Sequence, residues 1–244
     1  MWSRALLTAG VLGLLLVLVA IVGSYTFLPA LMSNLFEQSI ANDMGLDDRP
    51  EVTLSSQPPA SILSGTFADG SVSLRGGEFG GVRPKKVLID LDPFDLNMLK
   101  SVSGGVLTSD EPLSGKLRMK VSEDEISRIA SSAEKDISVS GIELEKDRIK
   151  VRTRVQLLGV DVPVAVTGGL RVGGRKLKFV PRRVSAFGVQ LPDRLSDELL
   201  SQADFAYPLQ DLPYKAEVSE VKIEKDYLIL SGRLESITLG AGNG

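Results

Sequence analysis

The stretch VSGIELEKDRIKVRT, residues 139–153, decides the fold, because apolar and polar residues alternate on both sides of a short polar turn. This two-residue period is that of a β-strand, so the stretch predicts a β-hairpin. A similar stretch, VSEVKIEKDYLILSG, begins about 79 residues later at Val218 and has the same Glu-Lys-Asp turn. Together they predict a helix-and-hairpin unit used twice, with a fainter third version near the N-terminus. Chance is the alternative, since Glu-Lys-Asp is ordinary turn chemistry.

Further strands are expected on both sides of this hairpin, punctuated by Gly-Gly pairs that indicate turns or bulges. The expected strands cover residues 51–57, 71–79, 85–91, 115–121, 137–143, 148–158, 162–172, 175–180, 214–223 and 227–232. Two amphipathic helices interrupt them. One covers residues 123–133, where Ser122 and Glu125 have capping-box spacing, and the other runs from Pro192 toward Ala203. The predicted fold class is α+β, with a strongly curved antiparallel sheet.

The N-terminal segment has the character of a membrane span. Residues 5–36 carry no charge, and residues 5–28 supply 24 mostly apolar positions where a bilayer core needs about 20. Arg4 precedes the run and Glu37 is the first charge after it, so the positive-inside bias places the N-terminus in the cytoplasm and the rest outside. A signal peptide cleaved near residues 22–24 is the alternative, and it also exports the domain.

These features divide the chain into four parts. Residues 1–28 are expected to form one transmembrane anchor or a signal segment. Residues 29–50 form a stalk helix and linker, since Pro29 suits a first helical turn and Gly45 ends the helical spacing. Residues 51–239 form the β-rich domain, and residues 240–244 a disordered tail. The sequence therefore predicts one exported domain on a short tether.

The composition excludes several classes of function. The chain has 244 residues, a net charge of −3 and a pI near 5.2, without the basic excess of nucleic-acid binders. It has no histidine and no cysteine, which removes imidazole bases, thiolate nucleophiles, disulfides and their zinc sites. No phosphate loop, no GxGxxG after a strand and no GxSxG motif occurs. The sequence predicts no enzyme, no cofactor, no metal site and no nucleic-acid partner.

A group of three aspartates is the remaining candidate for catalysis. Asp90 and Asp92 share a strand face, as a glycosidase pair would, and Asp95 follows closely. The three could also bind Ca²⁺, but the loop lacks the glycine and the terminal glutamate of an EF-hand. Because Pro93 ends this stretch, we interpret the aspartates as solvated surface residues.

The most suggestive pattern is the separation of apolar from basic residues in residues 116–121, 148–157 and 176–179. A sheet curved around its apolar face could hold an acyl chain inside and keep its basic face near anionic headgroups. The candidate headgroup or membrane-surface residues are Arg148, Lys150, Arg152, Arg154, Lys176 and Lys178. The candidate cavity or mouth residues are Phe67, Phe79, Phe94, Phe179, Phe187 and Phe205. The alternatives are ordinary half-exposed strands and plain core aromatics.

The exported region resembles a known family. The resemblance rests on LFEQSIANDMGL (35–46), PEVTLSSQPP (50–59), SILSGTFADGSVSLRGGEFGGVRPKKVLIDLDPFDL (61–96), SGKLRMKVSEDEISRIA (114–130) and the later hairpins. In this order of features the chain is similar to the LmeA-like phospholipid-binding family of bacterial cell-envelope proteins, over residues 35–239. The resemblance implies a tubular lipid-binding fold, in which a curved antiparallel sheet wraps a helix around an apolar cavity. It implies phospholipid as the partner, no enzyme activity and no individual site residue.

The resulting hypothesis is a membrane-tethered, extracytoplasmic protein that holds or shuttles phospholipid in an apolar cleft. Burying an acyl chain contributes about 0.8 kcal/mol per CH₂, so binding needs no polar hot spot. The alternative is a non-catalytic structural or interaction module of the envelope, whose sheet is filled solid. An internal apolar cavity distinguishes the two.

Overall fold

The computed structural model describes residues 33–34, 36–38, 41, 48–79, 81–104, 107–133, 139–157, 160–173, 175–192, 196, 206–209, 212 and 215–237. The anchor expected at residues 1–28, the tail at residues 240–244, and most of the stalk helix and of the second helix lie outside this part. Within the described part, no helix is both long enough and apolar enough to cross a membrane.

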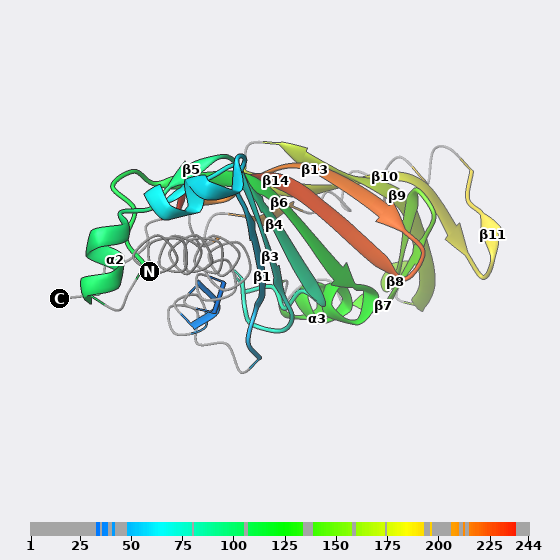
Figure 1. Ribbon diagram of the computed structural model, residues 1–244. Coiled ribbons are helices and arrows are strands. Elements are labelled where there is room, and N and C mark those ends of the chain that lie inside the picture. The colour runs from blue at the N-terminus through cyan, green and yellow to red at the C-terminus, as the bar shows by residue number, and fades with distance from the viewer. Residues whose placement is uncertain are drawn as a thin grey trace, which may run out of the picture.

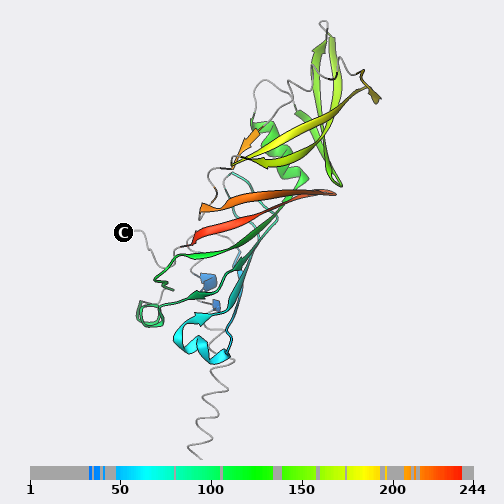
Figure 2. The same ribbon diagram turned by 90° about the horizontal axis from the view of Figure 1, so that it is seen from above.

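Two large antiparallel sheets contain most of the strands in the described part of the chain (Figure 1). The first sheet has the strand order β1 (Glu51–Ser55), β3 (Asp69–Leu74), β4 (Lys86–Leu91), β6 (Leu113–Ser122), β14 (Tyr227–Ile237) and β13 (Glu217–Glu224). The second has the order β11 (Val189–Gln190), β10 (Lys176–Ala186), β9 (Val160–Gly173), β8 (Arg148–Leu157) and β7 (Val139–Glu145), and β12 (Ala206–Pro208) also pairs with β10. The sheets follow one another along an elongated molecule (Figure 2).

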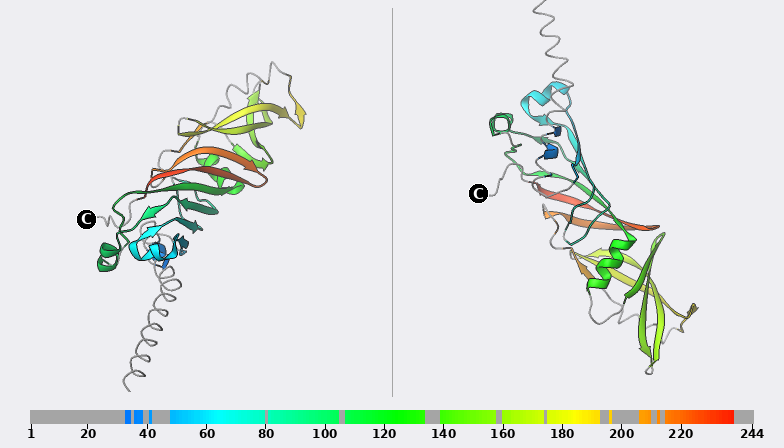
Figure 3. Two further views of the ribbon diagram at one scale, coloured as in Figure 1. Left: turned by 45° about the horizontal axis from the view of Figure 1, so that its top comes forward. Right: turned by 90° about the horizontal axis from the view of Figure 1, so that it is seen from below.

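The helices occupy different places along this length. α3 (Glu123–Ala133) lies where the two sheets meet (Figure 3). The 3-10 helix η1 (Pro59–Ser64) and α2 (Met98–Gly104) lie at the far end of the first sheet, near the two-stranded pair of β2 (Thr66–Phe67) and β5 (Phe94–Asp95). Because β6 leads directly into α3, the chain passes from the first sheet to the second through this helix.

The predicted α+β class with antiparallel strands is confirmed, and the helix predicted at residues 123–133 has those bounds. The prediction of one sheet is wrong, because the strands divide between two larger sheets and one small pair. The strand expected at residues 71–79 ends at Leu74, since Gly76 and Gly77 follow with φ of 74° and 80°. β10 continues past the expected end at residue 180 because a register shift between Pro181 and Arg183 accommodates the proline.

The two predicted hairpins correspond closely. β7 and β8 are joined by the turn Lys146-Asp147, and β13 and β14 by Lys225-Asp226. Both aspartates have positive φ, 62° and 68°. Each hairpin also has a register shift at the corresponding place, between Val139 and Gly141 and between Val218 and Glu220. The hairpin repeat is therefore present in the structure, whereas the helix expected before the second hairpin falls largely on undescribed residues.

The core of each sheet comes from alternate residues of its strands. In β6, every second residue from Leu113 to Val121 is buried while those between are half-buried or exposed. In the second sheet, Val164, Val166 and Phe179 are buried in the same way. Burying one such side chain contributes roughly 1.5–3 kcal/mol. The alternation gives each sheet one apolar face.

A candidate lipid-binding cavity

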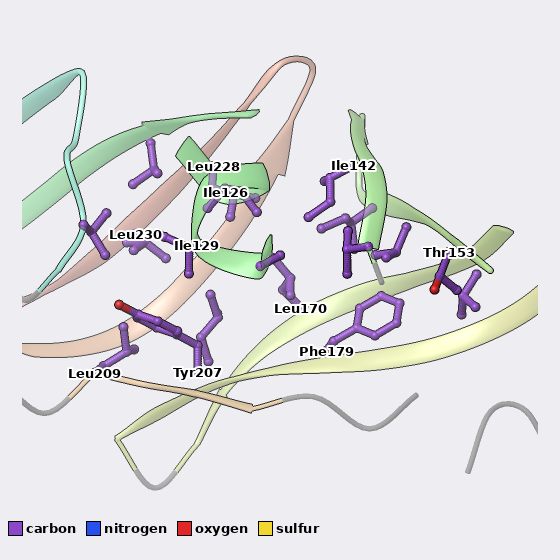
Figure 4. Close-up of a pocket in the computed structure, with 18 residues that line it drawn as sticks. Ile126, Ile129, Ile142, Thr153, Leu170, Phe179, Tyr207, Leu209, Leu228 and Leu230 are labelled. Atoms are coloured by element: carbon purple, nitrogen blue, oxygen red, sulfur yellow. The ribbon is translucent and has the colours of Figure 1, made fainter. Parts of the chain in front are cut away.

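An apolar cavity lies between α3, the strands of the second sheet and the first residues of β14 (Figure 4). Its volume is about 130 Å³, on the order of ten times what one water molecule needs. Of the 18 described residues that line it, all but Thr153 and Tyr207 have hydrocarbon side chains. Water in such a space would find few hydrogen-bonding partners, so the cavity suits a hydrocarbon ligand.

α3 supplies one wall of the cavity. Ile126, Ile129 and Ala130 line it, and their spacing places them on one face of the helix. Leu170 and Phe179 face them from the second sheet (Figure 4). The cavity is therefore framed by elements that are distant in the sequence.

The start of α3 is held by a buried carboxylate. Glu125 is only 8% exposed and accepts a 2.8 Å hydrogen bond from the backbone N–H of Arg83. The guanidinium of Arg128 donates to the same carboxylate at 2.8 and 2.5 Å, and also to the carbonyl of Gly81 at 2.8 Å. The Arg128 hydrogen bond lowers the pKa of Glu125 against the effect of burial. Glu125 thus binds a neighbouring loop, which differs from the predicted capping box with Ser122.

Glu123 ties α3 to both hairpins, to one through its side chain and to the other through its backbone. The side chain of Glu123 accepts a 2.6 Å hydrogen bond from the backbone N–H of Leu144 in β7. Its backbone N–H donates at 3.1 Å to the carbonyl of Asp226, in the turn of the other hairpin. The helix therefore begins at the junction of the two repeated units, and its position fixes the wall of the cavity.

A glycine shapes the opposite wall. A Cβ atom at Gly168 would lie 2.3 Å from the carbonyl oxygen of Val180 and 2.7 Å from the ring of Phe179. Both distances are shorter than a van der Waals contact, so the site requires glycine. The absence of a side chain lets the Phe179 ring lie against β9 and face the cavity.

The predicted aromatic residues lie in different places. Phe179 lines the cavity. Phe67 and Phe94, on the paired strands β2 and β5, stack on each other with ring centroids 5.0 Å apart and do not line the cavity, although they belong to the same hydrophobic core. Phe79 is buried beside the cavity-lining Val82, with which it exchanges backbone hydrogen bonds. Phe187 is 77% exposed in the turn between β10 and β11. Phe205 lies outside the described residues.

The predicted basic residues lie on the outer face of the second sheet. Arg148 forms an ion pair with Glu145, while Lys150 and Arg152 form ion pairs with Glu143 at 3.2 and 2.5 Å. These contacts lower the pKa of Glu143, through Lys150 first and then Arg152. Much of the basic stripe is therefore balanced across the hairpin.

The remaining three predicted basic residues are exposed. Arg154 lies on β8, while Lys176 and Lys178 lie on β10, on either side of the cavity-lining Leu177. Because strand residues alternate between faces, the two lysines point away from the cavity. Their proposed contact with headgroups or a membrane surface stays a prediction.

Of the aspartates considered for catalysis, Asp92 is engaged in polar contacts with neighbouring strands. Asp92 accepts hydrogen bonds from the hydroxyl of Ser114 at 2.8 Å and from Arg233 at 2.6 Å. These contacts, with that of Ser114 the largest, lower the pKa of Asp92, whereas a glycosidase general acid needs a raised pKa. Among the described residues, no three acidic side chains gather where they could hold a metal ion. Asp90 and Asp95 are exposed.

Sequence reasoning missed most of the cavity wall. The face of α3 was detectable from its amphipathic spacing, but its place over the second sheet was not. Tyr207 and Leu209 gave no signal, because β12 is three residues long and pairs with a strand about 30 residues earlier. The hydroxyl of Tyr207 lies close to Gly81, so this residue approaches the loop that Arg128 also contacts.

Comparison with known proteins agrees with this geometry. The model of one protein family, described as LmeA-like phospholipid-binding, matches residues 23–233. No curated protein and no solved structure matches the chain. The match covers most of the chain and confirms the resemblance read from the sequence. The chain belongs to the LmeA-like phospholipid-binding family.

Proposed function

We propose that this chain is a membrane-tethered, extracytoplasmic phospholipid-binding protein of the bacterial cell envelope. It holds or shuttles a lipid whose acyl chain lies in the cavity between α3 and the second sheet. The observation that carries the proposal is a hydrocarbon-lined cavity inside a member of a phospholipid-binding family. In this interpretation, α3 and the two sheets act as a tubular lipid-binding arrangement.

The size and chemistry of the cavity support a bound acyl chain. Six buried methylenes contribute about 5 kcal/mol, which favours retention of an acyl chain without a charged contact. A phospholipid headgroup would lose its hydration among these side chains and find almost no partners, so it stays outside. The volume of about 130 Å³ takes part of one chain.

The tether is supported by the sequence alone. The uncharged residues 5–28 with Arg4 upstream favour a retained anchor with the domain outside the cytoplasm. A short tether would keep the cavity close to the bilayer from which the lipid is taken. Transfer would then be restricted to short distances.

The test fills the cavity with a large side chain introduced on α3. Ala130 lines the cavity, whereas the adjacent Ser131 is exposed on the same helix. The full chain, in detergent micelles, is incubated with a phospholipid carrying a photoreactive group in one acyl chain, and the labelled fraction is measured by intact mass. Ala130→Trp should lower labelling several-fold while Ser131→Trp leaves it unchanged, with both variants folded by circular dichroism. Equal labelling of the two folded variants would contradict the proposal.

A further inference from the structure

A second pocket, of about 340 Å³, lies where the β9–β10 hairpin approaches β13. Val172 and Arg175 line it from the hairpin, and Glu217 and Ser219 line it from β13, which belongs to the first sheet. Leu209 lies between them. The pocket therefore opens between the two sheets, and charged side chains line it, in contrast to the apolar cavity.

The pocket adjoins the apolar cavity. Leu209 lines both spaces and is itself only 5% exposed. Along β9, Leu170 lines the cavity and Val172, two residues later on the same strand face, lines the pocket. The backbone N–H of Leu209 donates a 2.9 Å hydrogen bond to the carbonyl of Arg175, which fixes the shared wall beside the charged group. A molecule with an apolar tail and a polar head can occupy both spaces.

The pocket offers one positive and one negative group. Arg175 and Glu217 are exposed, and neither forms an ion pair with any residue in the described part of the chain. Arg175 differs in this respect from Arg148, Lys150 and Arg152 of β8, which form ion pairs with Glu143 or Glu145. A guanidinium binds a phosphate through paired hydrogen bonds, and a carboxylate pairs with an ammonium group.

We propose that this pocket binds the headgroup of a zwitterionic phospholipid, with the phosphate on Arg175 and the ammonium group on Glu217. The proposal rests on the proposed function and adds the class of headgroup. One cation and one anion suit a headgroup with no net charge, whereas Glu217 repels a headgroup that carries only a phosphate. An acyl chain of the same lipid extends past Leu209 into the apolar cavity.

The test compares two photoreactive lipids with identical acyl chains, phosphatidylethanolamine and phosphatidylglycerol, on the full chain. The variants are Arg175→Gln and Glu217→Gln. The matched controls are Arg171→Gln and Glu220→Gln, which remove exposed charges next to the pocket from residues that do not line it. All four positions are exposed, so the fold should be retained. Labelling is measured by intact mass for each lipid.

The wild-type chain should label with phosphatidylethanolamine in preference to phosphatidylglycerol. Arg175→Gln should lower labelling by both lipids at least about fivefold, the loss of one charged hydrogen-bonding group. Glu217→Gln should reduce the preference for phosphatidylethanolamine, and both controls should behave as wild type. Wild-type labelling that Arg175→Gln and Glu217→Gln leave unchanged would overturn the headgroup site, while sensitivity to Ala130→Trp would still support the proposed function. No wild-type labelling by either lipid would overturn both.

A free phosphate ion could bind the same guanidinium. A separate experiment therefore distinguishes the free ion from a lipid headgroup. Inorganic phosphate alone is titrated into the full chain, and its binding is followed by the change in chemical shift of the Arg175 side chain in nuclear magnetic resonance spectra. Weak phosphate binding together with fivefold lower lipid labelling in Arg175→Gln supports the headgroup. Tight phosphate binding with unaltered lipid labelling in Arg175→Gln would overturn the proposal and identify a site for the free ion.

Discussion

The backbone N–H of Asp147 donates a 3.1 Å hydrogen bond to the carbonyl oxygen of Ile223. The bond is reciprocated, because the N–H of Asp226 donates at 3.2 Å to the carbonyl of Leu144. Corresponding positions of the two repeated hairpins thus exchange equivalent bonds, as in a contact with approximate twofold symmetry. The hairpin ends join the two sheets beside the N-terminus of α3, which is where the apolar cavity lies.

The turns at this junction should be sensitive to side-chain branching. Asp147 and Asp226 have φ of 62° and 68°, a region that aspartate tolerates and β-branched residues strongly disfavour. We predict that Asp226→Val lowers the free energy of unfolding by about 1–2 kcal/mol, while Asp226→Gly changes it by less. Urea denaturation followed by circular dichroism measures both. Equal effects of valine and glycine would contradict the role of the backbone conformation.

The pairing of β13 with β14 should depend on Gly232. A Cβ atom there would lie 2.0 Å from the carbonyl oxygen of Glu217 and 2.8 Å from the Cα of Val218. Gly232→Ala should therefore destabilise the domain by about 1–3 kcal/mol, since the clash is with backbone. Gly141→Ala is the control, because a Cβ there meets nothing closer than 4.0 Å. The control should stay within about 0.5 kcal/mol of wild type, and a similar loss in both variants would refute the prediction.

Glu125 should make stability depend on pH. Its pKa is lowered, chiefly by the hydrogen bond from Arg128, so its stabilisation is present above the unfolded-state pKa of about 4.3 and is lost as the pH falls through the folded-state pKa. Glu125→Gln should cost about 1–3 kcal/mol at pH 7, and the difference from wild type should shrink below about pH 4. Asp110→Asn removes an exposed partner of Lys100 and should have the smaller effect at pH 7. A pH-independent cost at position 125 would contradict this account.

The wall at Gly168 should control lipid binding. Gly168→Ala forces the Phe179 ring or the Val180 carbonyl to move, whereas the Cβ of Gly169→Ala would meet only the side chain of Arg182, at 3.8 Å. Gly168→Ala should lower both the melting temperature and the labelling by a photoreactive lipid, and Gly169→Ala should alter neither. Thermal unfolding and intact mass provide the two measurements. Unchanged labelling in a destabilised Gly168→Ala protein would separate this wall from the binding site.

The sequence predicted local structure correctly where a single clear pattern covered the whole element. The alternation at residues 148–157 and the Glu-Lys-Asp turns predicted both hairpins, and the acidic first turn predicted α3. The division into two sheets did not follow, because alternation shows which face of a strand is buried and not which strand pairs with it. The family resemblance gave the expectation of an apolar cavity, but no position within it.

The candidate site was less predictable than the fold for a similar reason. Aromatic residues were expected at the cavity, but the stacked Phe67 and Phe94 do not line it. Aliphatic side chains of α3 and of the second sheet line most of the cavity, and in the sequence they look like any core residues. Arg175 resembles its basic neighbours in the sequence, and only the structure shows that it lines the same pocket as Glu217.

The most direct test of the central claim is the location of the photoreactive label. The full chain is labelled with a phospholipid that carries the reactive group at the end of an acyl chain, and the modified residues are identified by peptide sequencing in a mass spectrometer. The account predicts modification of α3 and of the strands that face it, in particular around Ile129, Leu170 and Phe179. Label confined to the stacked Phe67 and Phe94, or to the outer face of β8, would contradict it.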